Sequence, residues 1–135
     1  MRQIQSDVFC SFRQPIMGNA VVTGKDILLA EDEVTVREAY NMLLSLDGHS
    51  VTEAGNGAAA WDAFEHKKFD LVITDFEMPL MKGDELATRI KTAKPAQPVL
   101  MITAHCVGPE VPVDAVLNKP FSLDELRAAI ARVLE

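Results

Sequence analysis

The sequence predicts an α/β domain in which helices cover both faces of a parallel β-sheet. After Lys25, short apolar runs alternate with longer segments whose apolar residues recur at helical spacing, and such alternation is typical of parallel sheets. The runs are apolar throughout, as expected of strands that are buried on both faces. The length of 135 residues fits one domain, and a hydrophobic share of 48% is enough for a packed core.

Five runs are expected to be strands. Ile27 to Ala30, Leu71 to Thr74 and Val99 to Ile102 are short, largely apolar and rich in β-branched or aliphatic side chains. Two further runs are less apolar but fall at matching intervals. The expected strands span about 26–31, 50–54, 70–75, 98–103 and 114–118.

Helices are expected after each of these strands, with one exception discussed below. The first spans about 35–47 and opens with Thr35 and Glu38, which have the spacing of a capping box. The last opens at Ser122 with Glu125 as its capping partner. The two middle helices span about 57–67 and 83–93. Apolar side chains expected to face the sheet are Val36, Tyr40, Leu43 and Leu44 in the first helix, and Leu126, Ile130, Val133 and Leu134 in the last.

Residues 1–24 lie outside this pattern and are expected to form an N-terminal extension to a domain that spans 25–135. Their apolar content is too high for a typical disordered tail, so one interpretation is that they pack on the domain or on a partner. The alternatives are that natural translation starts at Met17, or that these residues are linker sequence.

The composition narrows the class of protein. A net charge of −7 argues against non-specific binding to nucleic acid or to an anionic membrane. The two cysteines, Cys10 and Cys106, lack metal-binding spacing and are expected to be reduced thiols. No run resembles a signal peptide or approaches membrane-spanning length, so we expect a cytoplasmic protein.

Polar side chains of several chemical kinds follow four of the five expected strands. The carboxyl ends of parallel strands meet at one edge of a sheet, where open α/β domains place their ligands. We therefore expect one pocket that contains three carboxylates, one hydroxyl and one ammonium group. The residues concerned are Glu31, Asp32, Asp75, Thr103 and Lys119.

Asp75 is the most informative of these residues. Met78-Pro79 and Gly83 cannot continue the strand that ends in Asp75 and predict a loop there. A carboxylate at the end of a central strand is partly desolvated, so it calls for a cation, a cluster of hydrogen bonds or chemistry. For an isolated aspartate, a role in a turn or a helix cap is the alternative.

Taken together, these residues give the chain a family resemblance. It resembles the receiver domain of two-component response regulators over roughly Lys25 to Glu135. Four pieces occur in family order: the Glu31-Asp32 pair, the D-x-x-M-P-x-x-x-G pattern from Asp75 to Gly83, the Thr103-Ala104 step and the Lys119-Pro120-Phe121 step. The resemblance implies a flavodoxin-like doubly wound sheet with strand order 2-1-3-4-5, which the alternation of elements alone does not fix.

The resemblance also implies a chemistry. Asp75 would be the phosphoacceptor, taking a phosphoryl group from phosphohistidine or a small acyl phosphate, in a domain that catalyses its own phosphorylation and dephosphorylation. Mg²⁺ would be bound directly by Asp32 and Asp75, by Glu31 directly or through water, and by the backbone carbonyl of Glu77. Lys119 would pair with one phosphoryl oxygen.

The remaining roles follow from the same resemblance. The Thr103 hydroxyl would donate to a second phosphoryl oxygen. The partner would be a histidine kinase or a histidine phosphotransferase, and the receiver would stand alone or belong to a hybrid kinase. We expect a monomer or a weak dimer.

Each assignment has a plainer alternative. Lys119 would otherwise be a solvated loop lysine, Thr103 a strand-end threonine and Glu31 a surface acid. The residues expected to lie on the surface without a role are Glu33, His49 and His66. His105 follows Thr103 beside the pocket mouth, where it could alter the access of water.

Three rival functions have some support in the sequence. Gly55 to Ala60 fits the dinucleotide pattern G-x-G-x-x-A, but the strand before it is short and polar, so a turn at Gly55 and a helix cap at Asn56 explain it better. An aspartyl phosphatase would need a second aspartate where Glu77 stands. A receiver that only docks a partner, without phosphorylation, is the third.

The chain departs from the usual receiver pattern in two places. Between Thr103 and Lys119, the residues Gly108, Pro109 and Pro112 forbid a normal helix, so the fourth helix is expected to be shortened or lost. Three residues before Lys119, where receivers usually carry an aromatic switch residue, the chain has Val116. We therefore expect the response to stay in the loops 76–83 and 104–113.

Overall fold

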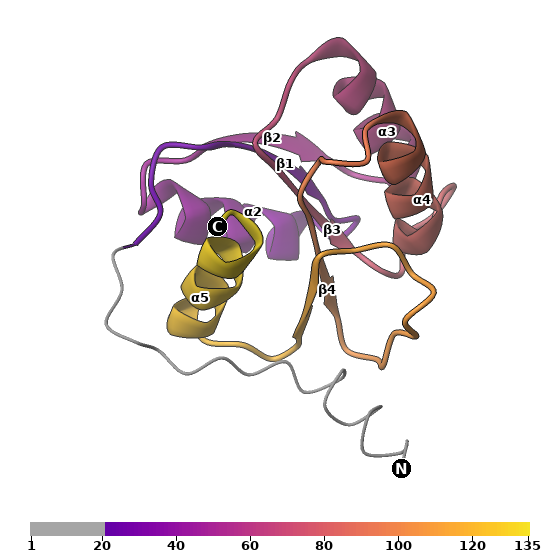
Figure 1. Ribbon diagram of the computed structural model, residues 1–135. Helices are drawn as coiled ribbons and strands as arrows, with labels where there is room; N and C mark the ends of the chain where they lie inside the picture. The colour runs from indigo at the N-terminus through magenta and orange to yellow at the C-terminus, as the bar shows by residue number, and fades with distance from the viewer. Residues whose placement is uncertain (1–20) are drawn as a thin grey trace.

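The computed structural model describes residues 21–135. It contains a five-stranded parallel sheet in the order β2-β1-β3-β4-β5, which confirms the expected flavodoxin-like topology (Figure 1). In chain order the elements are β1 (Asp26–Ala30), α2 (Val34–Ser45), β2 (Ser50–Ala54), α3 (Gly57–His66), β3 (Leu71–Asp75), α4 (Gly83–Ala93), β4 (Val99–Thr103), β5 (Ala115–Asn118) and α5 (Leu123–Val133). The expectations for residues 1–20 fall outside the described range, but Val22 packs against the core.

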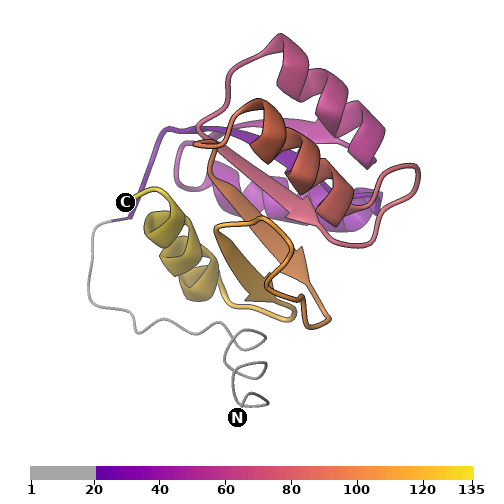
Figure 2. The ribbon, with the colours of Figure 1, turned by 45° about the vertical axis from the view of Figure 1, so that its right-hand side comes forward.

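The helices form two layers, one on each face of the sheet. Ile27 and Leu29 of β1 belong to a core that α2 and α5 close, whereas Leu28 and Ala30 belong to a second core that α3 and α4 close. Figures 1 and 2 show α2 with α5 on one side of the sheet and α3 with α4 on the other. Successive side chains of a strand point to opposite faces, so the strands are held from both sides.

The helix caps confirm one expectation and correct another. Ser122 caps α5 in a capping box, its hydroxyl accepting from the backbone N–H of Glu125 at 3.0 Å while the Glu125 carboxylate accepts from the Ser122 N–H. The box expected at Thr35 is wrong. Helix α2 begins one residue earlier, with Glu33 at its N-cap position and no side-chain cap hydrogen bond.

No helix joins β4 to β5 in the described part of the chain, where residues 104–114 run as a loop (Figure 2). The helix that was expected to be shortened or lost between Thr103 and Lys119 is therefore lost. A small apolar cluster forms here instead: Met101, Val107 and Val116, with Phe76, Val111 and Val113 packed against them. The valines of this loop therefore cover the part of the sheet that a helix would otherwise cover.

Two expectations about single side chains are wrong. His49 is only 6% exposed, and its Nδ1 atom accepts a hydrogen bond from the backbone N–H of Lys25 at 3.0 Å. Cys106 is disulfide-bonded rather than a reduced thiol, and Cys10 lies outside the described residues. His66 is exposed, as expected.

Candidate functional site

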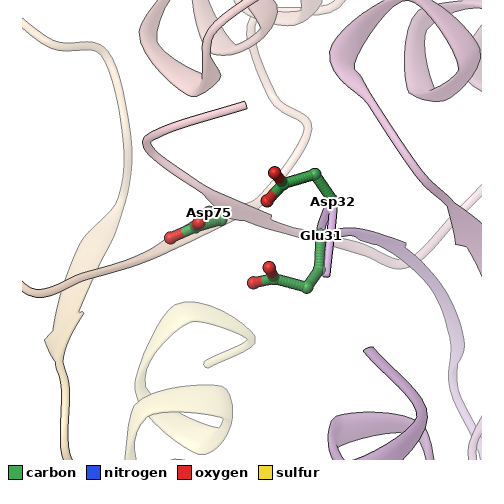
Figure 3. A group of neighbouring side chains, drawn as sticks. All are labelled: Glu31, Asp32 and Asp75. Atoms are coloured by element: carbon green, nitrogen blue, oxygen red, sulfur yellow. The ribbon is translucent and has the colours of Figure 1, made fainter. Parts of the chain in front are cut away.

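Three carboxylates meet where β1 and β3 end side by side in the sheet. Glu31 and Asp32 follow β1 directly, and Asp75 is the last residue of β3. One carboxylate oxygen from each residue lies within 4.8 Å of the other two, and the three groups face a common space (Figure 3). The sheet therefore brings together the acidic residues that the sequence placed in one pocket.

The Glu31 carboxylate is buried and only partly satisfied. It is 2% exposed, its Oε2 atom accepts from the Glu33 backbone N–H at 3.1 Å, and its buried Oε1 atom has no hydrogen bond. Burial raises the pKa of the Glu31 carboxyl to about 7, an effect that the Glu33 hydrogen bond opposes and the Asp75 charge reinforces. A buried oxygen without a donor suits a site for a cation.

Asp75 is held by an ion pair with Lys119. It is 8% exposed, and its Oδ1 atom lies 3.2 Å from the Lys119 Nζ atom, which is also 4.0 Å from Glu31 Oε1. Burial raises the pKa of Asp75, while the charge and hydrogen bond of Lys119 lower it, as does a hydrogen bond from the Phe76 N–H. The expected lysine is therefore in contact with the expected acceptor.

The loop after Asp75 explains the D-x-x-M-P-x-x-x-G pattern. A Cβ atom at Gly83 would lie 2.1 Å from the Asp75 carbonyl oxygen, so only glycine lets α4 begin so close to the strand end. Met78 and Met81 anchor the loop, since both are buried against the core of α3 and α4. Leu80 has a φ of +70° and is 81% exposed.

Thr103 reaches the same edge of the sheet from β4. Its register partner is Asn118, and its carbonyl accepts from the Lys119 backbone N–H at 2.9 Å. The side chain is buried, and its Oγ1 atom accepts from the His105 N–H at 3.0 Å. Because that bond uses only a lone pair, the hydroxyl can still donate its proton.

Some predicted residues stay at the margin of the pocket. The Glu77 side chain is 56% exposed and lies 3.8 Å from the Lys82 Nζ atom. Glu33 and His105 are exposed, although the backbone of each contacts a pocket residue. The prediction assigned only the backbone carbonyl of Glu77 to the metal, not its side chain. This role of the carbonyl stays a prediction.

Two neighbours of the pocket were not anticipated as site residues. Tyr40 packs against Phe121, with ring centroids 5.4 Å apart. Burial raises the pKa of the Tyr40 hydroxyl, and the charges of Glu31 and Asp75 add to this effect. Arg37 donates to the backbone carbonyl of Glu31 at 2.8 Å. The sequence placed Tyr40 only on the buried helix face, and it gave no sign of the Arg37 contact.

The N-terminus of α3 argues against the dinucleotide alternative. The Asn56 side chain accepts from the Ala59 N–H at 2.7 Å, as a helix cap. A Cβ atom at Gly57 would lie 2.1 Å from the Met81 carbonyl oxygen. The loop before α4 therefore occupies the space next to the helix end that a pyrophosphate would need.

A flavodoxin-like sheet with an acidic cluster and a lysine at its carboxyl edge is the arrangement of a receiver domain. The family model for the response regulator receiver domain matches residues 27–131. The chain belongs to this family, whose members work in two-component systems and interact with histidine kinases or phosphotransferases. In the part of the chain that the structure describes, no helix has both the length and the apolar character needed to cross a membrane.

Similar proteins differ in how much of their length the chain covers. The response regulator receiver protein CpdR of Brucella abortus is 39% identical over 116 residues, covering 82% of this chain and 97% of that protein. The phosphate regulon regulatory protein PhoB of Pseudomonas aeruginosa is 35% identical over 121 residues, covering 84% of this chain. The chain spans 53% of that PhoB and 25% of the NtrC of Rhizobium meliloti, which is 36% identical.

Solved receiver structures share the fold. The response regulator TrrA of Thermotoga maritima, solved in complex with Mg²⁺ and BeF, has a TM-score of 0.78 and 32% identity, covering 82% of this chain and 99% of that one. The chemotaxis regulator CheY4 of Vibrio cholerae has a TM-score of 0.75 and 28% identity, covering 83% and 100%.

Proposed function

We propose that this domain accepts a phosphoryl group on Asp75 in a Mg²⁺-dependent reaction. One observation carries the proposal: the buried Asp75 carboxylate lies in one cluster with Glu31 and Asp32 and within 3.2 Å of Lys119. A carboxylate nucleophile needs both a way to lower the repulsion of phosphoryl oxygens and a cation to receive them. A divalent cation bound by the cluster would supply the first, and Lys119 supplies the second.

The donor set fits Mg²⁺, which prefers oxygen ligands. Asp32 and Asp75 would hold the ion directly, Glu31 directly or through water, and the Glu77 carbonyl would complete the protein ligands. The buried Oε1 atom of Glu31, which has no hydrogen bond, supports this fit. When bound, the ion neutralises charge on the phosphoryl oxygens during transfer.

The step itself belongs to Asp75. An Asp75 carboxylate oxygen attacks phosphorus, a new O–P bond forms, and the bond from phosphorus to the donor breaks. The donor is the imidazole of a phosphohistidine on a kinase or phosphotransferase, or the carboxylate of a small acyl phosphate, and it leaves with the electron pair. The product is an aspartyl phosphate.

Lys119 and Thr103 then hold the product. The Lys119 ammonium shifts from the Asp75 carboxylate to a phosphoryl oxygen, a pair worth roughly 4 kcal/mol at about 4 Å and an effective dielectric near 20, before desolvation. The Thr103 hydroxyl donates to another phosphoryl oxygen, because its existing bond to His105 uses only a lone pair.

Intact-mass measurement after incubation with acetyl phosphate and Mg²⁺ tests the proposal. The wild type should gain one hydroxylamine-labile phosphoryl group, and Asp75→Asn should gain none. Asp84→Asn, on an acid in the first turn of α4, is the matched control and should react like the wild type. Labelling of Asp75→Asn would move the acceptor elsewhere. No uptake by a folded wild type, from acetyl phosphate or a phosphohistidine donor, would favour a docking module that works without phosphorylation.

A further inference from the structure

Arg37 connects α2 to the backbone of the acidic pair. Its Nη1 atom donates to the Glu31 carbonyl oxygen at 2.8 Å, and its Nε atom donates to Glu53 Oε1 at 3.0 Å. The side chain is 17% exposed, and Glu53 belongs to β2. One guanidinium thus joins three elements: the helix that carries it, the strand that carries Glu53, and the end of β1.

The Glu53 end of this arrangement is itself fixed. The Asn41 side-chain amide donates to Glu53 Oε2, and the Ser45 hydroxyl donates to Asn41 Oδ1 at 2.9 Å. The Asn41 hydrogen bond, together with the hydrogen bond and charge of Arg37, lowers the pKa of Glu53 and favours its charged form. A polar chain therefore runs along α2 from Ser45 to the pocket.

The Glu31 carbonyl is a sensitive point for the pocket. It belongs to the peptide unit that joins Glu31 to Asp32, so its direction helps to set both side chains. The Glu31 N–H donates to the Ala54 carbonyl at 3.0 Å, and the Glu31 carboxylate accepts from the Glu33 N–H. The Arg37 guanidinium adds a third hydrogen bond, which it donates to the Glu31 carbonyl oxygen.

Gly55 leaves room for this contact. A Cβ atom at Gly55 would lie 3.3 Å from the Arg37 Nη1 atom, closer than most side-chain contacts allow. The Glu31 carbonyl and the Glu53 carboxylate engage two nitrogens of the planar fork, which a lysine point charge cannot match.

We propose that Arg37 is a positioning residue that orients the Glu31–Asp32 peptide so that both carboxylates converge on the cation site. This inference rests on the proposed function, because the site it serves is the Mg²⁺ site of that reaction. Groups that orient metal ligands typically change metal affinity by about 10-fold to 100-fold when they are removed. We expect Arg37→Met to weaken Mg²⁺ binding by about 10-fold.

The experiment compares Arg37→Met with Arg127→Met. Arg127 forms a two-bond pair with Asp47, at 2.9 and 2.8 Å, between α5 and the turn after α2. Removing it takes away a similar pair that touches none of the three pocket carboxylates. For each variant, urea unfolding gives the stability, amide NMR gives the Mg²⁺ affinity, and hydrogen exchange gives the protection of the Glu33 N–H, which bonds the Glu31 carboxylate.

The expected result separates an effect on the position of the acidic pair from an effect on the stability of the fold. Arg37→Met should lose Mg²⁺ affinity and Glu33 N–H protection, whereas Arg127→Met should lose stability but keep both. Arg37→Lys should be intermediate. If Arg37→Met does not fold, Glu53→Gln replaces it, because it weakens only the support of the guanidinium and should give the same effects in smaller measure.

Two results would overturn the inference. One is a variant at Arg37 or Glu53 that loses stability like Arg127→Met but binds Mg²⁺ with wild-type affinity. The other is unchanged protection of the Glu33 N–H in a folded Arg37→Met. Failure of the proposed function looks different: the wild type itself would show no Mg²⁺ response, and the Glu33 N–H comparison would still decide whether Arg37 positions the acidic pair.

Discussion

The Nζ atom of Lys119 lies 3.2 Å from the Oδ1 atom of Asp75, and this pair spans β4 to join the end of β5 to the end of β3. Burial alone would favour a protonated Asp75, since it raises the pKa of that carboxyl. The lysine is the first group that opposes this shift. The lysine therefore favours the ionised form of Asp75.

Lys119→Ala should therefore raise the pKa of Asp75 further. The carboxyl loses the charge and hydrogen bond that lower its pKa, so its titration moves to higher pH in metal-free protein. Carboxyl-carbon NMR measures this shift directly. The variant should still bind Mg²⁺ but take up phosphate poorly from acetyl phosphate. Lys82→Ala is the control, because Lys82 forms its ion pair with the exposed Glu77 and its other contact is with the Phe76 ring. An Asp75 titration that is the same in both variants would contradict the assigned role.

His49 should make the fold less stable in mild acid. Burial lowers its pKa, so below about pH 6.5 the unfolded chain binds a proton that the folded chain does not. The free energy of unfolding then falls as pH is lowered from 6.5 toward the folded-state pKa, by about 1.4 kcal/mol for each unit of the shift. A protonated Nδ1 could no longer accept from the Lys25 N–H.

Urea unfolding between pH 5 and 8 measures this effect as the difference between the wild type and His49→Gln. The comparison is needed because the raised pKa of Glu31 acts in the opposite direction: the folded state binds that proton more readily and gains stability as pH falls. The variant should lose the histidine-dependent part of the slope. His66→Gln, on an exposed side chain, is the control, and a similar change there would exclude His49 as the source.

Gly83→Ala should destabilise the domain by about 1–3 kcal/mol. Its Cβ atom would collide with the Asp75 carbonyl oxygen, a backbone atom that cannot move without shifting the strand end. Urea unfolding measures the cost. Gly108→Ala is the comparison, because its new Cβ atom meets only the carboxylate end of the exposed Glu110 side chain, which can move away. Its cost should stay within about 0.5 kcal/mol. Equal costs would show that the close approach at Gly83 is not tight.

Binding of beryllofluoride, a phosphoryl mimic, should change the order of the loops 76–83 and 104–113 while the protein stays monomeric. A ligand shifts only states with which it interacts differently, and these loops flank the site. The 104–113 loop has few of its own backbone bonds, such as Val111 N–H to the Gly108 carbonyl at 3.1 Å, so it can open locally. Hydrogen exchange and sedimentation measure both effects.

The outcome that contradicts this is a beryllofluoride-dependent dimer that protects Val116 and residues 122–134. Val116 is already 3% exposed and packed with Val107, so there is no aromatic switch to turn inward. Asp75→Asn is the control for the loops, and it should show no change on addition of beryllofluoride.

The sheet and its pocket were predictable because their signals are local. An apolar run that ends in Asp75 or in Glu31 marks both a buried strand and its carboxyl end. In contrast, the expected cap at Thr35 was wrong because Glu33, whose N–H bonds the Glu31 carboxylate, takes the cap position. That hydrogen bond is part of the pocket, and α2 begins at Val34, directly after the residue that donates it.

Contacts that depend on packing left no local sign. His49 is buried because a turn with Gly48 at a φ of +76° brings it against the backbone before β1. Arg37 contacts a backbone carbonyl, a group that every residue has, so no residue type marks its acceptor. Such contacts follow from how elements meet in space and could be found only from the structure.

The two residues of the Asp75–Lys119 ion pair are synthesised far apart in time, because they lie at the ends of β3 and β5. Synthesis produces all three carboxylates before the lysine, because the cation comes with β5, the last strand. A nascent chain that has completed β1 to β4 therefore holds its acids without their cation. The addition of β5 to the edge of the sheet therefore also brings the lysine whose charge balances part of the charge of the pocket.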